Sequence, residues 1–196
     1  MKHIKNIVLD VGGIIFDDSK KNIEKLLGKN CDIIYKLAYG KSFKECLLGN
    51  KKVNEHIESL SNYKEFENLK YILSKENLYK SYPLITMNFE YIKTLQKQGY
   101  KLYLLTNITE DSYNYINDLI NINSVFDGGI YSYQEHIIKP DKRIYNLLID
   151  KYNLKKEETI FFDDKEKNAI SAINQGISSY VFKSIEDIKN IISKVI

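Results

Sequence analysis

The chain has 196 residues, a net charge of +3 and 43% hydrophobic residues, which suits one globular core with or without an insertion. Lysines are scattered, often beside Glu or Asp, so no basic stripe predicts nucleic-acid binding, and no run of about 18 apolar residues predicts a membrane span. The two cysteines, Cys31 and Cys46, match no metal-binding spacing and are expected to be buried or half-buried free thiols. With no cleavage site after the apolar N-terminal segment, we expect a cytoplasmic protein.

The first expected strand runs into an acidic residue. The apolar run 7–9 leads directly into Asp10, and Gly12 and Gly13 follow. A continuous β-branched run suits a strand buried on both faces, as in a parallel sheet. Because a buried unpaired charge is costly, Asp10 is expected at the carboxyl end of a central strand, where open α/β sheets bind ligands.

Residues 19–82 have a helical pattern with few glycines and prolines. Apolar residues recur at helical spacing, and Gly28, Gly40 and Gly49 punctuate them. The pattern predicts four or five short helices, with most aromatic residues in the core of the bundle. We therefore divide the chain into a core of residues 1–18 and 83–196 and a helical cap of residues 19–82.

From residue 83 onward, helices and strands alternate. The expected strands are residues 101–106, 130–132, 159–162 and 180–182. Five helices are expected: residues 86–98, one that begins at about residue 110, one that begins at Lys139-Pro140, one that ends at residue 176, and residues 184–194. Such alternation predicts a doubly wound α/β fold with a parallel sheet and right-handed crossovers.

Polar residues follow four of the expected strands at the same relative place. Since the carboxyl ends of parallel strands share one edge of a sheet, these residues are expected to converge on one site: Asp10, Thr106, Asn107, Lys139, Asp163 and Asp164.

This set of side chains predicts phosphoryl transfer through an aspartate. Three clustered carboxylates need a hard cation among them, and Mg²⁺ suits oxygen ligands. Asp10 would then attack phosphorus to form an aspartyl-phosphate. Thr106 and Asn107 are expected to bind phosphate oxygens, and Lys139 to balance their charge.

Four segments resemble the motifs of haloacid dehalogenase-like (HAD) hydrolases. They are Asp10-Val-Gly-Gly-Ile-Ile, Leu105-Thr106-Asn107, Lys139-Pro140, and Phe161-Phe-Asp-Asp164 with Asn168. The insert resembles the helical cap of that superfamily, and the region 143–177 resembles the branch with sugar-phosphate phosphatases and the phosphatase domain of epoxide hydrolases. The resemblance implies that Asp10 is nucleophile and metal ligand, that the Gly12 carbonyl and Asp164 also bind the metal, and that Asp163 and Asn168 orient these ligands.

The chain departs from this pattern at Gly12, where the superfamily usually has an acid–base Asp. Loss of such a group typically costs about 10²–10⁴-fold in rate. The protein could act on good leaving groups, use another residue or a water, or bind a phosphorylated ligand without turnover. A metal-free 2-haloacid dehalogenase is a further alternative, disfavoured by Asp163-Asp164.

Asp17 and Asp18 are interpreted as hinge or turn residues.

We therefore predict a Mg²⁺-dependent phosphomonoester hydrolase that acts on a small phosphorylated metabolite, with sugar phosphates favoured. No nucleic acid or membrane partner is expected. The three histidines, His3, His56 and His136, show no metal-ligand spacing and are expected at the surface.

Overall fold

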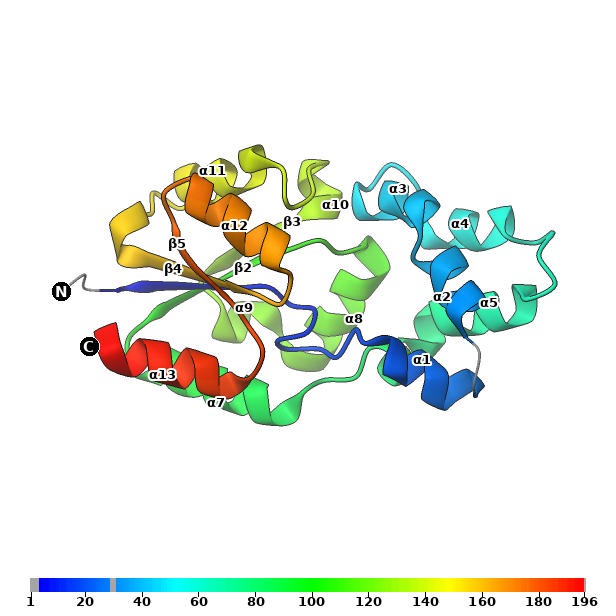
Figure 1. Cartoon of the computed structure of the whole chain (residues 1–196), viewed down its shortest axis with the longest axis horizontal. Helices are drawn as coiled ribbons and strands as arrows, with labels where there is room; N and C mark the ends of the chain where they lie inside the picture. The colour runs from blue at the N-terminus through cyan, green and yellow to red at the C-terminus, as the bar shows by residue number, and fades with distance from the viewer. Residues whose placement is uncertain (1–3, 29–30, 196) are drawn as a thin grey trace.

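The computed structural model describes residues 4–28 and 31–195 and has a parallel five-stranded sheet at its centre (Figure 1). The strand order is β3-β2-β1-β4-β5, and every pairing is parallel. The strands are β1 Asn6–Leu9, β2 Lys101–Thr106, β3 Gly128–Tyr131, β4 Thr159–Asp163 and β5 Ser178–Val181. This topology confirms the predicted doubly wound α/β fold and places β1 in the middle of the sheet.

Helices cover both faces of the sheet, so the central strands are buried on both sides (Figure 1). Ile7 and Leu9 belong to the hydrophobic cluster on one face, whereas Val8 belongs to the cluster on the other. The first cluster is covered by α7 Thr86–Lys97, α8 Glu110–Ile120, α9 Ile122–Val125 and α13 Ile185–Val195. The second is covered by α11 Lys142–Lys151 and α12 Glu166–Asn174. The alternation along β1 follows from the two-residue period of a strand.

The segment after β1 forms a helical insert with a hydrophobic cluster of its own, drawn from residues between Ile23 and Leu73. Within the described residues, the insert has six α-helices, more than the four or five predicted; two of them, α3 and α6, are single turns. Its helices are α1 Lys20–Leu27, α2 Asp32–Ala38, α3 Lys44–Leu47, α4 Val53–Ser59, α5 Phe66–Leu73 and α6 Leu78–Ser81, with 3₁₀ turns at Lys41–Phe43 and Lys75–Asn77.

The two chain segments that join the insert to the sheet domain run side by side. The Asp17 N–H donates to the Pro83 carbonyl at 2.9 Å, and the Ile85 N–H donates to the Ile15 carbonyl at 2.8 Å. A second contact lies between α3 and α10 Ser132–Glu135, where the Ser132 hydroxyl donates to the Leu47 carbonyl at 2.6 Å. Hydrogen bonds at these two places therefore connect the insert to the sheet domain, and the Lys52–Glu110 ion pair adds a further link.

Two further local predictions are wrong. Lys139-Pro140 does not open a helix: α11 begins at Lys142, and the carboxylate of its N-cap residue Asp141 accepts the Arg143 N–H at 3.0 Å. An N-cap carboxylate satisfies one of the free N–H groups at a helix start, which fixes the boundary after the proline.

The second error concerns His56. Its side chain is fully buried in the insert, with Nε2 3.0 Å from the Ala38 carbonyl and its ring against Phe43. His136 is exposed as predicted, and His3 lies outside the described residues. Cys31 and Cys46 are buried and unpaired, as predicted. Over residues 4–28 and 31–195, no helix is long and apolar enough to cross a membrane.

Candidate active site

The site begins with Asp10 at the carboxyl end of β1. The Asp10 N–H donates to the Phe162 carbonyl at 2.9 Å, which extends the pairing of β1 with β4 by one residue. Its carboxylate Oδ1 accepts the Val11 N–H at 2.7 Å, and only 4% of the residue is exposed. The central strand therefore delivers a carboxylate to the sheet edge in a fixed orientation.

Lys139 supplies the positive charge that this buried carboxylate needs. Its Nζ lies 2.9 Å from Asp10 Oδ1 and 2.6 Å from Asp163 Oδ2, and it donates to the Leu105 carbonyl at 2.7 Å. The lysine side chain is 1% exposed. The ammonium thus joins the ends of β1, β2 and β4, and the predicted convergence of Asp10, Asp163 and Lys139 is confirmed.

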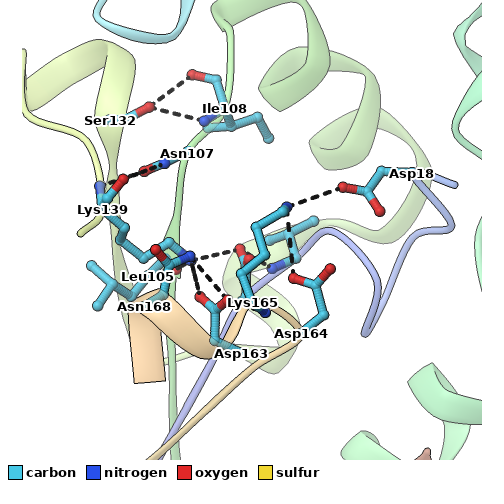
Figure 2. A network of polar contacts seen from close by, with 12 residues as sticks. Asp18, Leu105, Asn107, Ile108, Ser132, Lys139, Asp163, Asp164, Lys165 and Asn168 are labelled. Carbon is cyan, nitrogen blue, oxygen red and sulfur yellow. Dashed lines mark hydrogen bonds and ion pairs between the residues drawn. The ribbon is translucent and has the colours of Figure 1, made fainter. Parts of the chain in front are cut away.

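Asn107 holds the loop that carries this lysine. Its amide oxygen accepts the Lys139 N–H at 2.8 Å, and its amide nitrogen donates to the Lys139 carbonyl at 3.1 Å (Figure 2). This pair of hydrogen bonds clamps the loop to the end of β2. The predicted phosphate contacts of Asn107 and of buried Thr106 stay predictions, and one amide N–H of Asn107 remains for a ligand.

Asp163 is held by donors on both of its oxygens. Oδ1 accepts the Lys165 backbone N–H at 2.8 Å and the Asn168 amide at 3.0 Å, while Oδ2 accepts from Lys139. Asp163 is fully buried, and its carboxylate is bound by donors from the start of α12 and from the Lys139 loop. This geometry fits the orienting role that the resemblance implied for Asp163 and Asn168.

Asp164 differs from Asp163 because its carboxylate is only partly engaged. Its Oδ1 is buried without a hydrogen-bond partner, although the Lys165 ammonium lies 3.6 Å away. The side chain is 27% exposed. Asp164 therefore offers an oxygen without a hydrogen bond close to Asp10.

Gly13 makes room for that carboxylate. Its φ of +73° lies in the left-handed region, and a Cβ built there would lie 2.9 Å from the carboxylate carbon of Asp164. A side chain at position 13 would be strained and would displace Asp164, so both conformation and space require glycine.

Lys165 is a site residue that the sequence analysis missed. Its ammonium lies 3.5 Å from Asp18 Oδ2, between that carboxylate and Asp164 (Figure 2). Burial opposes its charge, but the carboxylates of Asp10, Asp18 and Asp164 outweigh burial and raise the pKa of Lys165. The only signal in the sequence is its position directly after Asp163-Asp164.

The electrostatics of the site favour an added positive charge. Burial, followed by the neighbouring Asp163 charge, raises the pKa of Asp10 to about 6 although Lys139 and Lys165 act in the opposite direction. Burial, with the charges of Asp18 and Asp163, also raises the pKa of Asp164. Burial therefore disfavours the charged forms of these two carboxylates more than the lysines favour them.

The donor set fits a hard divalent cation. Asp10, Asp163 and Asp164 each offer a carboxylate oxygen, and these oxygens lie within 4.8 Å of one another. With Asp163 engaged by lysine and amide donors, the unpartnered oxygen of Asp164 and the carboxylate of Asp10 are the natural ligands. An all-oxygen set of this kind suits Mg²⁺.

Comparisons with solved structures agree with this architecture. A HAD family enzyme from Bacteroides thetaiotaomicron superposes with a TM-score of 0.75 at 20% identity, covering 97% of this chain and 98% of that one. The same enzyme in complex with magnesium and inorganic phosphate gives a TM-score of 0.71 at 21% identity, covering 92% of this chain and 94% of that one. A predicted HAD-like hydrolase from Porphyromonas gingivalis gives 0.70 at 26% identity, covering 96% of this chain and 98% of that one.

A curated relative matches part of the chain. A sesquiterpene phosphatase from Aspergillus oryzae (strain ATCC 42149 / RIB 40) is 32% identical over 81 residues, which are 41% of this chain and 41% of that protein. The family model of haloacid dehalogenase-like hydrolases matches residues 4–176, a segment that contains Asp10, Asn107, Lys139, Asp163 and Asp164. The chain therefore belongs to the haloacid dehalogenase-like hydrolases.

Proposed function

We propose that the protein is a Mg²⁺-dependent phosphomonoester hydrolase that forms an aspartyl-phosphate on Asp10. The observation that carries the proposal is the buried Asp10 carboxylate, held by Lys139 at 2.9 Å, with an Asp164 oxygen that accepts no hydrogen bond beside it. The sesquiterpene phosphatase and the HAD enzyme that binds magnesium and phosphate support this chemistry.

Each side chain has a defined task in this proposal. Asp10, the Gly12 carbonyl and Asp164 would hold Mg²⁺, which when bound neutralises phosphate charge and orients the phosphoryl group. An Asp10 carboxylate oxygen attacks phosphorus, the bond from phosphorus to the leaving oxygen breaks, and water later hydrolyses the acyl phosphate. Lys139 keeps the carboxylate oriented and balances its charge, while Thr106 and Asn107 bind phosphate oxygens.

Asp163 and Asn168 act one step away from the chemistry. The Asn168 amide donates to both carboxylate oxygens of Asp163, at 3.0 and 3.1 Å, and Asp163 in turn holds the Lys139 ammonium. This chain of contacts fixes the lysine that faces the nucleophile. We therefore assign both residues to positioning.

The helical insert is proposed to be a cap that closes over the leaving group. It is joined to the sheet domain through the paired segments at 15–17 and 83–85, beside the site-facing Asp18. A cap of this kind excludes water and selects the substrate. We propose a small phosphorylated metabolite as substrate, with sugar phosphates the first class to screen.

The test uses para-nitrophenyl phosphate with Mg²⁺ or with EDTA. Wild type is expected to turn it over only with Mg²⁺, and Asp10→Asn is expected to lose activity while its thermal unfolding stays that of a folded protein. Asp118→Asn, at an exposed position of α8, is the matched control and should keep activity. Folded wild type that binds Mg²⁺ and phosphate without turnover would instead show a binding module. Halide release from a 2-haloacid without metal would show a dehalogenase.

A further inference from the structure

The Asp18 carboxylate occupies the space where a side chain of residue 12 would lie. After Gly12 the chain folds back, with the Gly13 N–H donating to the Phe16 carbonyl at 2.8 Å. A Cβ built on Gly12 would lie 2.7 Å from Asp18 Oδ2 and 3.2 Å from its carboxylate carbon. The turn therefore places Asp18 over Gly12, and Gly12 is the residue two positions after the proposed nucleophile Asp10.

The backbone of Gly12 does not itself require glycine. The φ angle of Gly12 lies outside the left-handed region, unlike that of Gly13. A Cβ at position 12 would instead require the Asp18 carboxylate to move. Because residue 12 is a glycine, the Asp18 carboxylate can lie where a side chain of residue 12 would otherwise be.

Asp18 is positioned to meet a ligand. Its side chain is 39% exposed, and its Oδ2 lies 3.5 Å from the Lys165 ammonium, which also faces Asp164 (Figure 2). The Tyr82 hydroxyl, from the end of the insert, would lie 3.7 Å from the same Cβ position. Asp18 is therefore partly exposed, close to Tyr82 at the end of the insert.

The other carboxylates near Asp10 already have tasks. Asp163 is fully buried with both oxygens engaged, and Asp164 is proposed to bind the metal. Among the described residues of the site, Asp18 is the partly exposed carboxylate that no other proposed role uses. A departing alkoxide needs a proton, and a positioned carboxyl group is an efficient source of one.

We propose that Asp18 is the proton-transfer residue of this hydrolase, an inference that rests on the proposed function. As Asp10 attacks phosphorus, the bond to the leaving oxygen breaks, and the Asp18 carboxyl group gives a proton to that oxygen, releasing an alcohol. Water then attacks the phosphorus of the aspartyl-phosphate and returns a proton to Asp18, which frees phosphate and restores Asp10. Atoms and charge balance without any further reactant.

The neighbouring Asp17 provides the matched control. Its Oδ1 accepts the Ser19 N–H at 2.9 Å, and its carbonyl accepts the Asn22 amide at 2.9 Å, so it shapes the start of α1. Asp17 thus fits the predicted turn role, whereas Asp18 does not take part in these hydrogen bonds. Asn at either position keeps the size of the side chain and removes only the carboxyl chemistry.

The test compares kcat/KM for two aryl phosphates of similar size, para-nitrophenyl phosphate and phenyl phosphate. Only the poorer leaving group, phenolate, needs a proton at departure. Asp18→Asn is expected to lower kcat/KM for phenyl phosphate by about 10²–10⁴-fold and to affect the activated ester much less. Asp17→Asn should preserve the wild-type ratio between the esters. Mg²⁺ affinity, measured by calorimetry, should stay within about twofold of wild type in Asp18→Asn, since the proposal gives Asp18 no metal contact.

The outcomes separate this inference from the proposed function. No turnover of para-nitrophenyl phosphate by wild type would overturn the proposed function and this inference with it. Wild-type turnover with an equal effect of Asp18→Asn on both esters would overturn only the assignment of Asp18.

A measurement of stability tests the geometry independently of activity. Gly12→Ala is expected to destabilise wild type but not the Asp18→Ala variant, because the clash is with the Asp18 carboxylate. Equal destabilisation in both backgrounds would contradict the placement of Asp18 over Gly12.

Discussion

The Lys139 ammonium lies 2.6 Å from the Asp163 carboxylate, and both side chains are buried, with exposed fractions of 1% and 0%. The same ammonium holds Asp10, so one buried cation stabilises two buried carboxylates. Burial makes this group sensitive, because removing the cation leaves charges that water cannot reach.

Lys139→Met is therefore expected to lower the free energy of unfolding by about 3–5 kcal/mol, measured by urea titration in EDTA. The double variant Lys139→Met/Asp163→Asn should recover part of that loss, since it leaves one uncompensated carboxylate instead of two. Both variants should lose phosphatase activity. A single variant as stable as wild type would show that the buried pair is dispensable.

Gly13→Ala is expected to weaken Mg²⁺ binding by at least about tenfold, because the new Cβ displaces the Asp164 carboxylate. Gly99→Ala is the control: Gly99 also has a positive φ, +93°, but nothing lies within 4 Å of the position that its new Cβ would take. Both variants should lose about 1–2 kcal/mol of stability to backbone strain. Calorimetric titration with Mg²⁺ should distinguish them, and equal affinities would remove Asp164 from the metal site.

Ser132→Ala is expected to loosen the contact between the helical insert and the sheet domain. The buried Ser132 hydroxyl donates to the Leu47 carbonyl and accepts the Ile108 N–H at 2.9 Å. Its removal leaves both groups unpaired, at a cost of about 1–3 kcal/mol. Hydrogen exchange of the α3 amides should accelerate in this variant and stay unchanged in Ser193→Ala, an exposed serine of α13. Unchanged α3 exchange in Ser132→Ala would mean that other contacts hold the insert.

His56 is expected to make stability depend on pH. Burial, with the nearby charge of Lys51, lowers the pKa of His56 below its ordinary value of 6.5, and Nδ1 is buried without a partner. The unfolded chain then binds the proton more readily. The contribution of neutral His56 is therefore complete above about pH 6.5 and is lost as pH falls through the folded-state pKa.

Urea titrations at about pH 7.5 and pH 5 test this linkage. Wild type should lose more stability on acidification than His56→Gln, in which the side chain stays neutral at both values. Equal losses would show that His56 does not contribute to the pH dependence.

The sequence was most informative about strand ends and least informative about contacts between distant segments. Buried apolar runs predicted β1, β2 and β4, and the shared edge of a parallel sheet predicted that Asp10 and Lys139 converge. The ion pair of Asp18 with Lys165 joins residues 147 positions apart, and its formation depends on how the turn after Gly12 folds back. No local pattern encodes that path.

The same limit explains the other errors. His56 looked like a surface residue because its burial depends on packing within the insert, and helix spacing alone does not determine that packing. The sequence predicts too early a start for α11 because Pro140 is acceptable in a first turn, whereas the Asp141 cap decides the boundary.

The most direct measurement of the central claim is reductive trapping of the acyl phosphate. Protein turning over para-nitrophenyl phosphate with Mg²⁺ is quenched and treated with borohydride, which reduces an aspartyl-phosphate to homoserine, and the peptide containing residue 10 is analysed by mass spectrometry. We expect homoserine at position 10 only when substrate and Mg²⁺ are both present. Turnover with an unmodified Asp10 and a trapped residue elsewhere would contradict the account.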